Sequence, residues 1–202
     1  MPSPDRAAVV LCGGLSARMG RPKATLPFGP ETLLVRVVRT CAEACGEIVV
    51  VAAEGQELPC LPARATVVRD RTPGQGPLEG LAAGLAAARA PAAFCTSCDV
   101  PFLVPAYVGR MFAALGDAAS AQAVVEGFPQ PLLAVYRTAL AARARDLVRA
   151  GRRRVVFLVE GEAVNLVPEA EVRAVDPDLR SFLNINTPEE YAAALREAGW
   201  AG

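Results

Sequence analysis

Short apolar runs alternate along the chain with longer segments in which apolar residues recur every three or four positions. Residues 7–12 (AAVVLC) form the first run and lead into Gly13 and Gly14, as expected for a buried strand that enters a turn. Between residues 31 and 45 the apolar side chains share one helical face, and charged residues occupy the opposite face. This alternation predicts βα units arranged around a mostly parallel sheet.

The same two patterns continue towards the C-terminus. Runs rich in valine or alanine predict further strands, and segments of helical period predict further helices. Strands are expected at residues 47–53, 65–69, 92–98, 121–126 and 131–136, and helices at residues 77–89, 105–115 and 138–150. A Gly-Phe-Pro-Gln turn separates the last two strands, and an antiparallel member of the sheet is expected there. Residues 153–159 fit a strand and a helix equally well.

The start of the last helix carries a specific signal. Thr187 is the expected N-cap, Pro188 suits the first turn, and Glu190 completes a capping box. No repeat or linker divides the 202 residues. We therefore expect one α/β domain over residues 1–202, with a Rossmann-like, mostly parallel sheet flanked by helices.

The charge balance excludes several classes of function. Lysine and arginine together number 21, as do aspartate and glutamate, so no overall field favours nucleic acid or an anionic membrane as a partner. The chain has no histidine, which excludes Ser-His-Asp and Cys-His mechanisms and removes the commonest metal ligand. The longest uncharged stretch is eleven residues (7–17), fewer than the roughly 20 that cross a bilayer.

The N-terminal residues lack a basic region followed by an apolar segment, so we expect a cytoplasmic location. The six cysteines are expected to be reduced thiols, because a chain with this much apolar material needs no disulfides.

The loop after the first predicted strand, LCGGLSARMGRPK, combines glycines with cations. Gly13 and Gly14 permit positive φ and a close approach of backbone N–H groups to phosphate oxygens. Arg18 and Lys23 add positive charge. The spacing matches neither a P-loop nor a dinucleotide fingerprint. We interpret the segment as an anion-binding loop, and the alternative is a basic surface turn.

This loop resembles the nucleotidyltransferase signature LAGGxSxRMGxxK of the molybdenum cofactor guanylyltransferase (MobA) family and of its cytidylyltransferase and sugar-nucleotide relatives. Further blocks that resemble the family cover almost the whole chain: GPLEGL at 76–81, SCDVPF at 97–102, GRRRVV at 151–156 and NINTPEE at 184–190. GPLEGL and NINTPEE are more similar to the guanylyltransferases, whereas RMGRPK is common to both branches. The resemblance implies the fold of the nucleotide-diphospho-sugar transferases.

The resemblance also implies a reaction, the transfer of GMP from Mg-GTP to the molybdopterin-type molybdenum cofactor, which gives molybdopterin guanine dinucleotide and pyrophosphate. It implies Mg²⁺ as cofactor, GTP and molybdenum cofactor as ligands, and molybdoenzyme maturation proteins as further partners. The absence of histidine fits this chemistry, because an acceptor phosphate is already ionised and needs no general base. Two alternatives stay open: a cytidylyltransferase acting on the same acceptor, and a carrier of the same fold without turnover.

The residues with implied catalytic roles are Lys23, Asp99 and Arg18. Asp99 follows a predicted strand, at the sheet edge where open α/β folds bind ligands, and the resemblance makes it the Mg²⁺ ligand. An aspartate that caps a turn is the alternative. Lys23 and Arg18 would neutralise the triphosphate as its bond breaks. The implied nucleotide-binding set is Leu11, Cys12, Gly13, Gly14, Lys23, Asp70 and Asp99.

The acceptor site is expected at two polar segments near the C-terminus. Asn184 and Asn186 alternate on one face of an extended segment, where paired amides suit the acceptor or metal-bound phosphates, although turn chemistry would also explain them. Arg153 lies in a cluster of three arginines that suits the phosphate of a pterin, and a solvated helix end is the alternative.

The sequence departs from the family pattern at two places. The family often carries asparagine where this chain has Ala52 and Ala53, and a small residue where it has Cys12. We interpret Cys12 as a small apolar residue and not as a nucleophile.

Two further pairs of residues have a suggestive spacing. Cys95 and Cys98 have zinc-ligand spacing without a second pair, so they are expected in the core. Gly80 and Gly84, four residues apart, permit close packing on one helix face.

Overall fold

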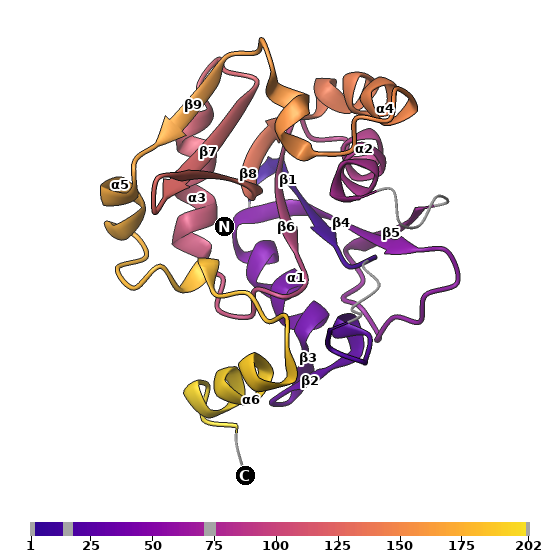
Figure 1. Ribbon diagram of the computed structural model, residues 1–202, viewed down its shortest axis with the longest axis vertical. Coiled ribbons are helices and arrows are strands. Elements are labelled where there is room, and N and C mark those ends of the chain that lie inside the picture. The colour runs from indigo at the N-terminus through magenta and orange to yellow at the C-terminus, as the bar shows by residue number, and fades with distance from the viewer. Residues whose placement is uncertain (1–2, 14–17, 71–75, 201–202) are drawn as a thin grey trace.

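The computed structural model describes residues 3–13, 18–70 and 76–200, and within them seven strands form one mixed sheet in the order β5-β4-β1-β6-β8-β7-β9 (Figure 1). Neighbouring strands are parallel, except that β8 is antiparallel to both β6 and β7. This confirms the mostly parallel sheet and the antiparallel member expected of the hairpin. The strands are β1 (Ser3–Leu11), β4 (Cys45–Ala53), β5 (Ala65–Asp70), β6 (Ala92–Ser97), β7 (Ser120–Val125), β8 (Phe128–Arg137) and β9 (Val164–Val167).

Helices cover both faces of the sheet, as Figure 1 shows. Helices α1 (Leu33–Ala44) and α3 (Pro105–Leu115) pack on one face, and α2 (Pro77–Ala87) and α4 (Ala141–Arg149) on the other. Alternate residues of β1 enter the two cores, Ala8 and Val10 on the α1 side and Ala7 and Val9 on the α2 side. Burial on both faces explains why β1 reads as a continuous apolar run in the sequence.

A third, smaller cluster joins the C-terminal helix to a short hairpin below the sheet in Figure 1. The helix is α6 (Pro188–Glu197), and the hairpin consists of β2 (Pro27–Phe28) and β3 (Glu31–Thr32) after the 3₁₀ helix η1 (Lys23–Thr25). The predicted capping box is confirmed: Thr187 accepts from the Glu190 N–H, and the Glu190 side chain accepts from the Thr187 N–H.

Two expectations about local structure were wrong, and one open choice is resolved. The hairpin turn is Glu126-Gly127, both with positive φ (52° and 82°), so the Phe-Pro-Gln part of the expected turn belongs to β8. Residues 153–159, for which a strand and a helix were both open, contain a helix of the 3₁₀ type, η3 (Val155–Val159). The first long helix begins two residues later than expected, because the Thr32 side chain caps it by accepting from the Val35 N–H.

The sequence patterns also missed several short elements. These are η1, β2, β3, β9, the helix α5 (Glu169–Arg173) and the 3₁₀ helix η4 (Arg180–Phe182), whereas the 3₁₀ helix η2 (Thr138–Leu140) lies within the helix predicted at residues 138–150. None of the helices in the described ranges is long and apolar enough to cross a membrane.

Candidate active site

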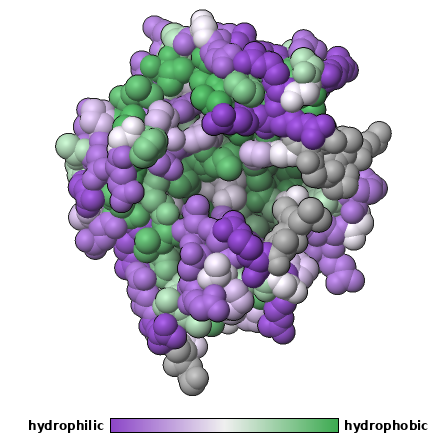
Figure 2. Space-filling model, viewed as in Figure 1, coloured by the Kyte–Doolittle hydropathy of each residue, from purple (hydrophilic) through white to green (hydrophobic). Residues whose placement is uncertain are grey.

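The carboxyl ends of three parallel strands bring several of the expected site residues to one edge of the sheet. Cys12 and Gly13 follow β1, Asp70 ends β5, and Asp99 comes two residues after β6. This is the edge at which open α/β sheets bind ligands. Figure 2 shows the face of the molecule that is turned to the viewer in Figure 1. This face is hollowed near its centre, with hydrophobic residues in the hollow and hydrophilic residues around it.

The centre of the site is a hydrogen-bonded cluster of Lys23, Asp99 and Asn186. Lys23 Nζ donates to Asp99 Oδ2 at 2.7 Å and to Asn186 Oδ1 at 2.9 Å. The Ser97 hydroxyl donates to the other carboxylate oxygen, Oδ1. The Lys23 and Asp99 side chains are each only 15% exposed. Three residues that the sequence singled out separately are therefore in direct contact.

The segment that carries Asn186 packs against the loop that carries Asp99, and this places Asn186 in the cluster. The Ile185 N–H donates to the Asp99 carbonyl at 2.9 Å, and the Val104 N–H donates to the Ser181 hydroxyl at 3.0 Å. Buried Asp176 shapes the turn that precedes Ser181, because its carboxylate accepts from the N–H groups of Arg180 and Ser181. The segment is thus fixed to the loop that carries Asp99.

The loop after β1 is held close to β4. The Cys12 N–H donates to the Val51 carbonyl at 2.9 Å, and the Cys12 thiol donates to the same oxygen at 3.3 Å. Burial raises the pKa of the Cys12 thiol to about 12, against the opposing effect of Arg69. Because a neutral thiol is a poor nucleophile, the pKa agrees with our interpretation of Cys12 as a small apolar residue.

Glycine is needed at position 13 for a different reason than expected. A Cβ built on Gly13 would lie 3.0 Å from the Ala53 backbone nitrogen, whereas φ at Gly13 lies outside the positive region. Close approach to β4, and not left-handed backbone, therefore selects glycine there. Gly14 lies outside the described residues.

No hydrogen bond described in the structure joins Arg18, Asp70, Arg153 or Asn184 to the cluster of Lys23, Asp99 and Asn186. Arg18 and Asn184 are exposed, and Asp70 is buried at the end of β5, where its carbonyl accepts from the Glu54 N–H at 3.1 Å. Arg153 is exposed, and its carbonyl lies beside Gly76 at the start of α2.

The glycine and cysteine pairs are confirmed as packing residues. A Cβ on Gly84 would lie 2.3 Å from Val9 Cγ1, and one on Gly80 would lie 3.2 Å from a Leu11 methyl. Cys95 and Cys98 belong to cores on opposite faces of the sheet, so they cannot share a zinc ion. Among the described residues, no group of three or more histidine, cysteine, aspartate and glutamate side chains could hold a metal.

Asp99 is the residue whose chemistry fits a divalent cation. One oxygen of its carboxylate accepts from the Ser97 hydroxyl, and the other accepts from Lys23 Nζ. Mg²⁺ commonly takes one or two protein carboxylates and completes its shell with water and substrate phosphates. The site therefore fits a metal that arrives with phosphates better than a metal held by protein alone.

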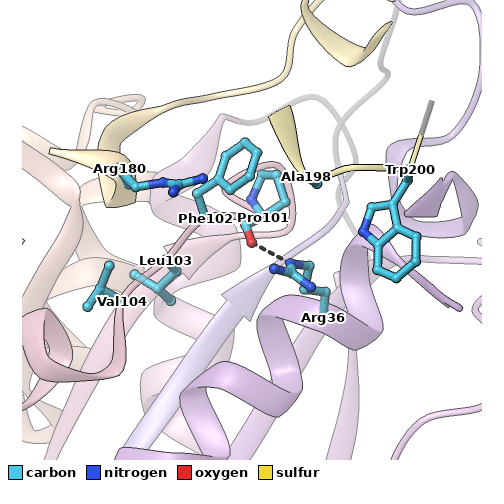
Figure 3. Close-up of a pocket in the computed structure, with 8 residues that line it drawn as sticks. All are labelled: Arg36, Pro101, Phe102, Leu103, Val104, Arg180, Ala198 and Trp200. Carbon is cyan, nitrogen blue, oxygen red and sulfur yellow. Dashed lines mark hydrogen bonds between the residues drawn. The ribbon is translucent and has the colours of Figure 1, made fainter. Parts of the chain in front are cut away.

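A separate crevice of about 330 Å³ lies behind the loop that carries Asp99 (Figure 3). Its arginines are already paired: Arg36 Nε donates to the Pro101 carbonyl at 2.6 Å, and Arg180 pairs with Glu197 at 2.8 Å. The Arg180 guanidinium also lies 4.7 Å from the centre of the Phe102 ring. The contacts of Arg36 with Pro101 and of Arg180 with Phe102 stabilise the loop that carries Asp99.

Sequence reasoning missed two polar residues of the site, Ser97 and Gln56. Ser97 is the first residue of the SCDVPF motif that contains Asp99, so its place in the motif was a usable signal. Gln56 lies in a turn after β4, and its side chain binds the loop after β1. No sequence pattern predicts that the Gln56 side chain would bind the Cys12 carbonyl.

The comparisons with known proteins agree with this geometry. The family described as "MobA-like NTP transferase domain" matches residues 8–164. A curated protein of Mycobacterium tuberculosis (strain H37Rv), "Probable molybdenum cofactor guanylyltransferase", is 39% identical over 197 residues, which cover 94% of this chain and 93% of the relative.

Two solved structures share the fold. "Molybdopterin-guanine dinucleotide biosynthesis protein A" from Archaeoglobus fulgidus has a TM-score of 0.79 at 23% identity, and the match covers 97% of this chain and all of the other. 2-C-methyl-D-erythritol 4-phosphate cytidylyltransferase from Thermus thermophilus has a TM-score of 0.72 at 22% identity, covering 95% and 98% of the two chains.

Proposed function

The chain belongs to the MobA-like NTP transferase family, and on that premise we propose that it is a molybdenum cofactor guanylyltransferase. It transfers GMP from GTP to the molybdenum cofactor and releases pyrophosphate. The observation that carries the proposal is the contact of Lys23 with Asp99 and Asn186 at the carboxyl edge of the sheet. A cation, a carboxylate and an amide are thereby placed where a triphosphate, its metal and an acceptor can meet.

The triphosphate is held by the loop after β1. In this proposal the backbone N–H groups of Gly13 and Gly14 donate to the phosphate oxygens, and Arg18 and Lys23 neutralise the charge of the triphosphate. Leu11 and Cys12 position the start of this loop, and Asp70 contacts the nucleotide from the end of β5. Asp99 Oδ2, which accepts from Lys23 Nζ, is the oxygen that would hold a divalent cation, and the Lys23 ammonium would then be available to donate to a phosphate oxygen.

A divalent metal belongs to the reaction of this family, and we propose Mg²⁺ with Asp99 as its protein ligand. When bound, Mg²⁺ supplies charge neutralisation at the α-phosphate and the leaving pyrophosphate. Ser97 holds the Asp99 carboxylate in place, so that Oδ2 is the oxygen presented to the site.

The acceptor enters from the C-terminal side. Asn186 and Asn184 donate to acceptor oxygens, and Arg153 lies near the start of α2, where it can attract an acceptor phosphate. The attacking phosphate is already ionised near neutral pH, so the absence of histidine removes nothing that the reaction needs. A cytoplasmic location, with delivery of the product to molybdoenzyme maturation proteins, completes the proposal.

The test is to mix the protein with Mg²⁺, GTP and molybdenum cofactor and to measure pyrophosphate release together with formation of the guanine dinucleotide. Both products are expected in equal amounts, and neither is expected without the acceptor. Binding of cofactor without pyrophosphate release would show a carrier of the same fold instead. Pyrophosphate release with CTP and not with GTP would show that the protein is a cytidylyltransferase. A cytidylyltransferase is among the solved structures with this fold.

A further inference from the structure

The hydrogen-bond ladder between β1 and β4 ends in an unusual way. The strands are parallel, with Leu11 opposite Val51, and the Cys12 N–H donates to the Val51 carbonyl. In a parallel ladder the next bond in the series would run from the Ala53 N–H to the Cys12 carbonyl. Instead, the Ala53 N–H donates to Gln56 Oε1 at 3.0 Å, and Gln56 Nε2 donates to the Cys12 carbonyl at 2.9 Å.

The Gln56 amide therefore replaces one rung of the ladder and bridges the two backbone groups that this rung would have joined. Both backbone groups that would have bound each other stay satisfied, so the opening leaves no unpaired polar atom. Arg69 on β5 fixes the turn that carries Gln56, because it donates to the carbonyls of Ala53 (3.1 Å) and Gln56 (2.7 Å). Contacts with residues at the ends of β1, β4 and β5 therefore fix the position of Gln56.

The direction of the Cys12 carbonyl also determines that of the next N–H group. The Cys12–Gly13 peptide is planar and trans, so its N–H points opposite to its carbonyl. With the carbonyl held by Gln56, the Gly13 N–H points away from Gln56. In the proposed function the Gly13 N–H donates a hydrogen bond to a phosphate oxygen of the triphosphate.

We propose that Gln56 is a positioning residue of the nucleotide site, which holds the β1–β4 ladder open and aims the Gly13 N–H at the triphosphate. This inference rests on the proposed function. Both polar atoms of the Gln56 side chain already have backbone partners, which favours positioning over direct reading of the base. Gln56 therefore affects the binding of the triphosphate, and its effect does not depend on which base the nucleotide carries.

The experiment compares Gln56→Met with the wild type and with a matched control, Gln130→Met. Methionine has nearly the length of glutamine and forms neither hydrogen bond, so Ala53 and Cys12 are free to close the ladder. Gln130 is a partly exposed residue of β8 whose side chain donates only to the Phe128 carbonyl. Calorimetric titrations use two probes, GTP and inorganic triphosphate, each with Mg²⁺.

We expect Gln56→Met to weaken binding of both probes by about tenfold, the loss of roughly one charge-assisted hydrogen bond. The KM for GTP should rise by a similar factor, while the KM for the acceptor and kcat stay within about threefold and the control matches the wild type. Gln56→Ala, which removes the same two bonds, provides a second variant if Gln56→Met does not fold.

Unchanged binding of both probes would overturn the inference and leave the proposed function standing. Weakened binding of GTP with unchanged binding of triphosphate would also overturn it, because Gln56 would then read the nucleoside. Failure of the wild type itself to bind GTP would refute the proposed function, and the role assigned to the loop with it.

Discussion

Gly84 lies where helix α2 crosses β1, and its replacement tests how closely these elements pack. An alanine Cβ there would lie 2.3 Å from Val9 Cγ1 and 3.1 Å from Val51 Cγ2. Valine has a stiff χ1, so Val9 cannot turn away freely, and α2 must move off the sheet. Arg153, a proposed acceptor-binding residue, lies beside the start of α2, so a displacement of the helix should also move this residue.

The expected magnitude follows from two opposing effects. Alanine in a helix interior gains about 1 kcal/mol over glycine. Overpacking a well-filled core costs about 1–3 kcal/mol, and a 2.3 Å contact belongs at the upper end. Gly84→Ala should therefore lower the free energy of unfolding by about 1–2 kcal/mol, or roughly 3–6 °C in Tm for a chain of this size.

Gly109 in α3 is the matched control. Nothing lies within 4 Å of a Cβ built there, and φ is not positive. Gly109→Ala should raise stability by about 0.5–1 kcal/mol through helix propensity alone. Denaturant titrations of the two variants and the wild type measure both effects. Stabilisation by Gly84→Ala equal to that by Gly109→Ala would refute the close packing of α2 against β1.

Three further predictions concern catalysis and pH. Asp99→Asn should abolish pyrophosphate release while the circular dichroism spectrum and Tm stay near those of the wild type, because a neutral amide holds Mg²⁺ poorly; retained Mg²⁺-dependent turnover would contradict the assignment. Lys23→Ala should lower the transfer rate by roughly 10²–10³, measured in single turnovers, and a change below about threefold would make Lys23 a surface cation only. Burial raises the pKa of Cys12, Cys45 and Cys95 to about 12. The folded chain thus keeps protons that the unfolded chain loses near pH 8.5, and the free energy of unfolding should fall between about pH 9 and 12, by up to about 1.4 kcal/mol per pH unit for each thiol; an equally steep fall in Cys95→Ala would count against this explanation.

The parts of the fold that the sequence predicts best are those with a strong periodic pattern or a cap. Helix α3 has the bounds expected from residues 105–115, and the cap at Thr187 is where the capping box indicated. Residues 155–159 fold as a 3₁₀ helix because contacts with the rest of the chain, and not local periodicity, determine their form. Short elements such as β9 carry too few residues for a pattern.

For the site, the sequence indicated the residue types but not their contacts. Lys23 and Asp99 follow from motif and strand order, whereas their contact with Asn186 depends on the return of the C-terminal segment over the Asp99 loop. Gln56 has no sequence signal, because its role arises from a missing rung between two strands. Long-range hydrogen bonds of this kind become visible only in the folded chain.

The most direct test of guanylyl transfer is the ratio of kcat/KM for GTP over CTP with molybdenum cofactor as acceptor. Guanine offers two donors beside an acceptor, whereas cytosine offers an acceptor and one amine, so a site that pairs the guanine donors leaves its own acceptors unpaired with cytosine. The proposed function predicts a preference for GTP of at least about tenfold, equivalent to about 1.4 kcal/mol. Equal use of the two nucleotides, or a preference for CTP, would contradict it.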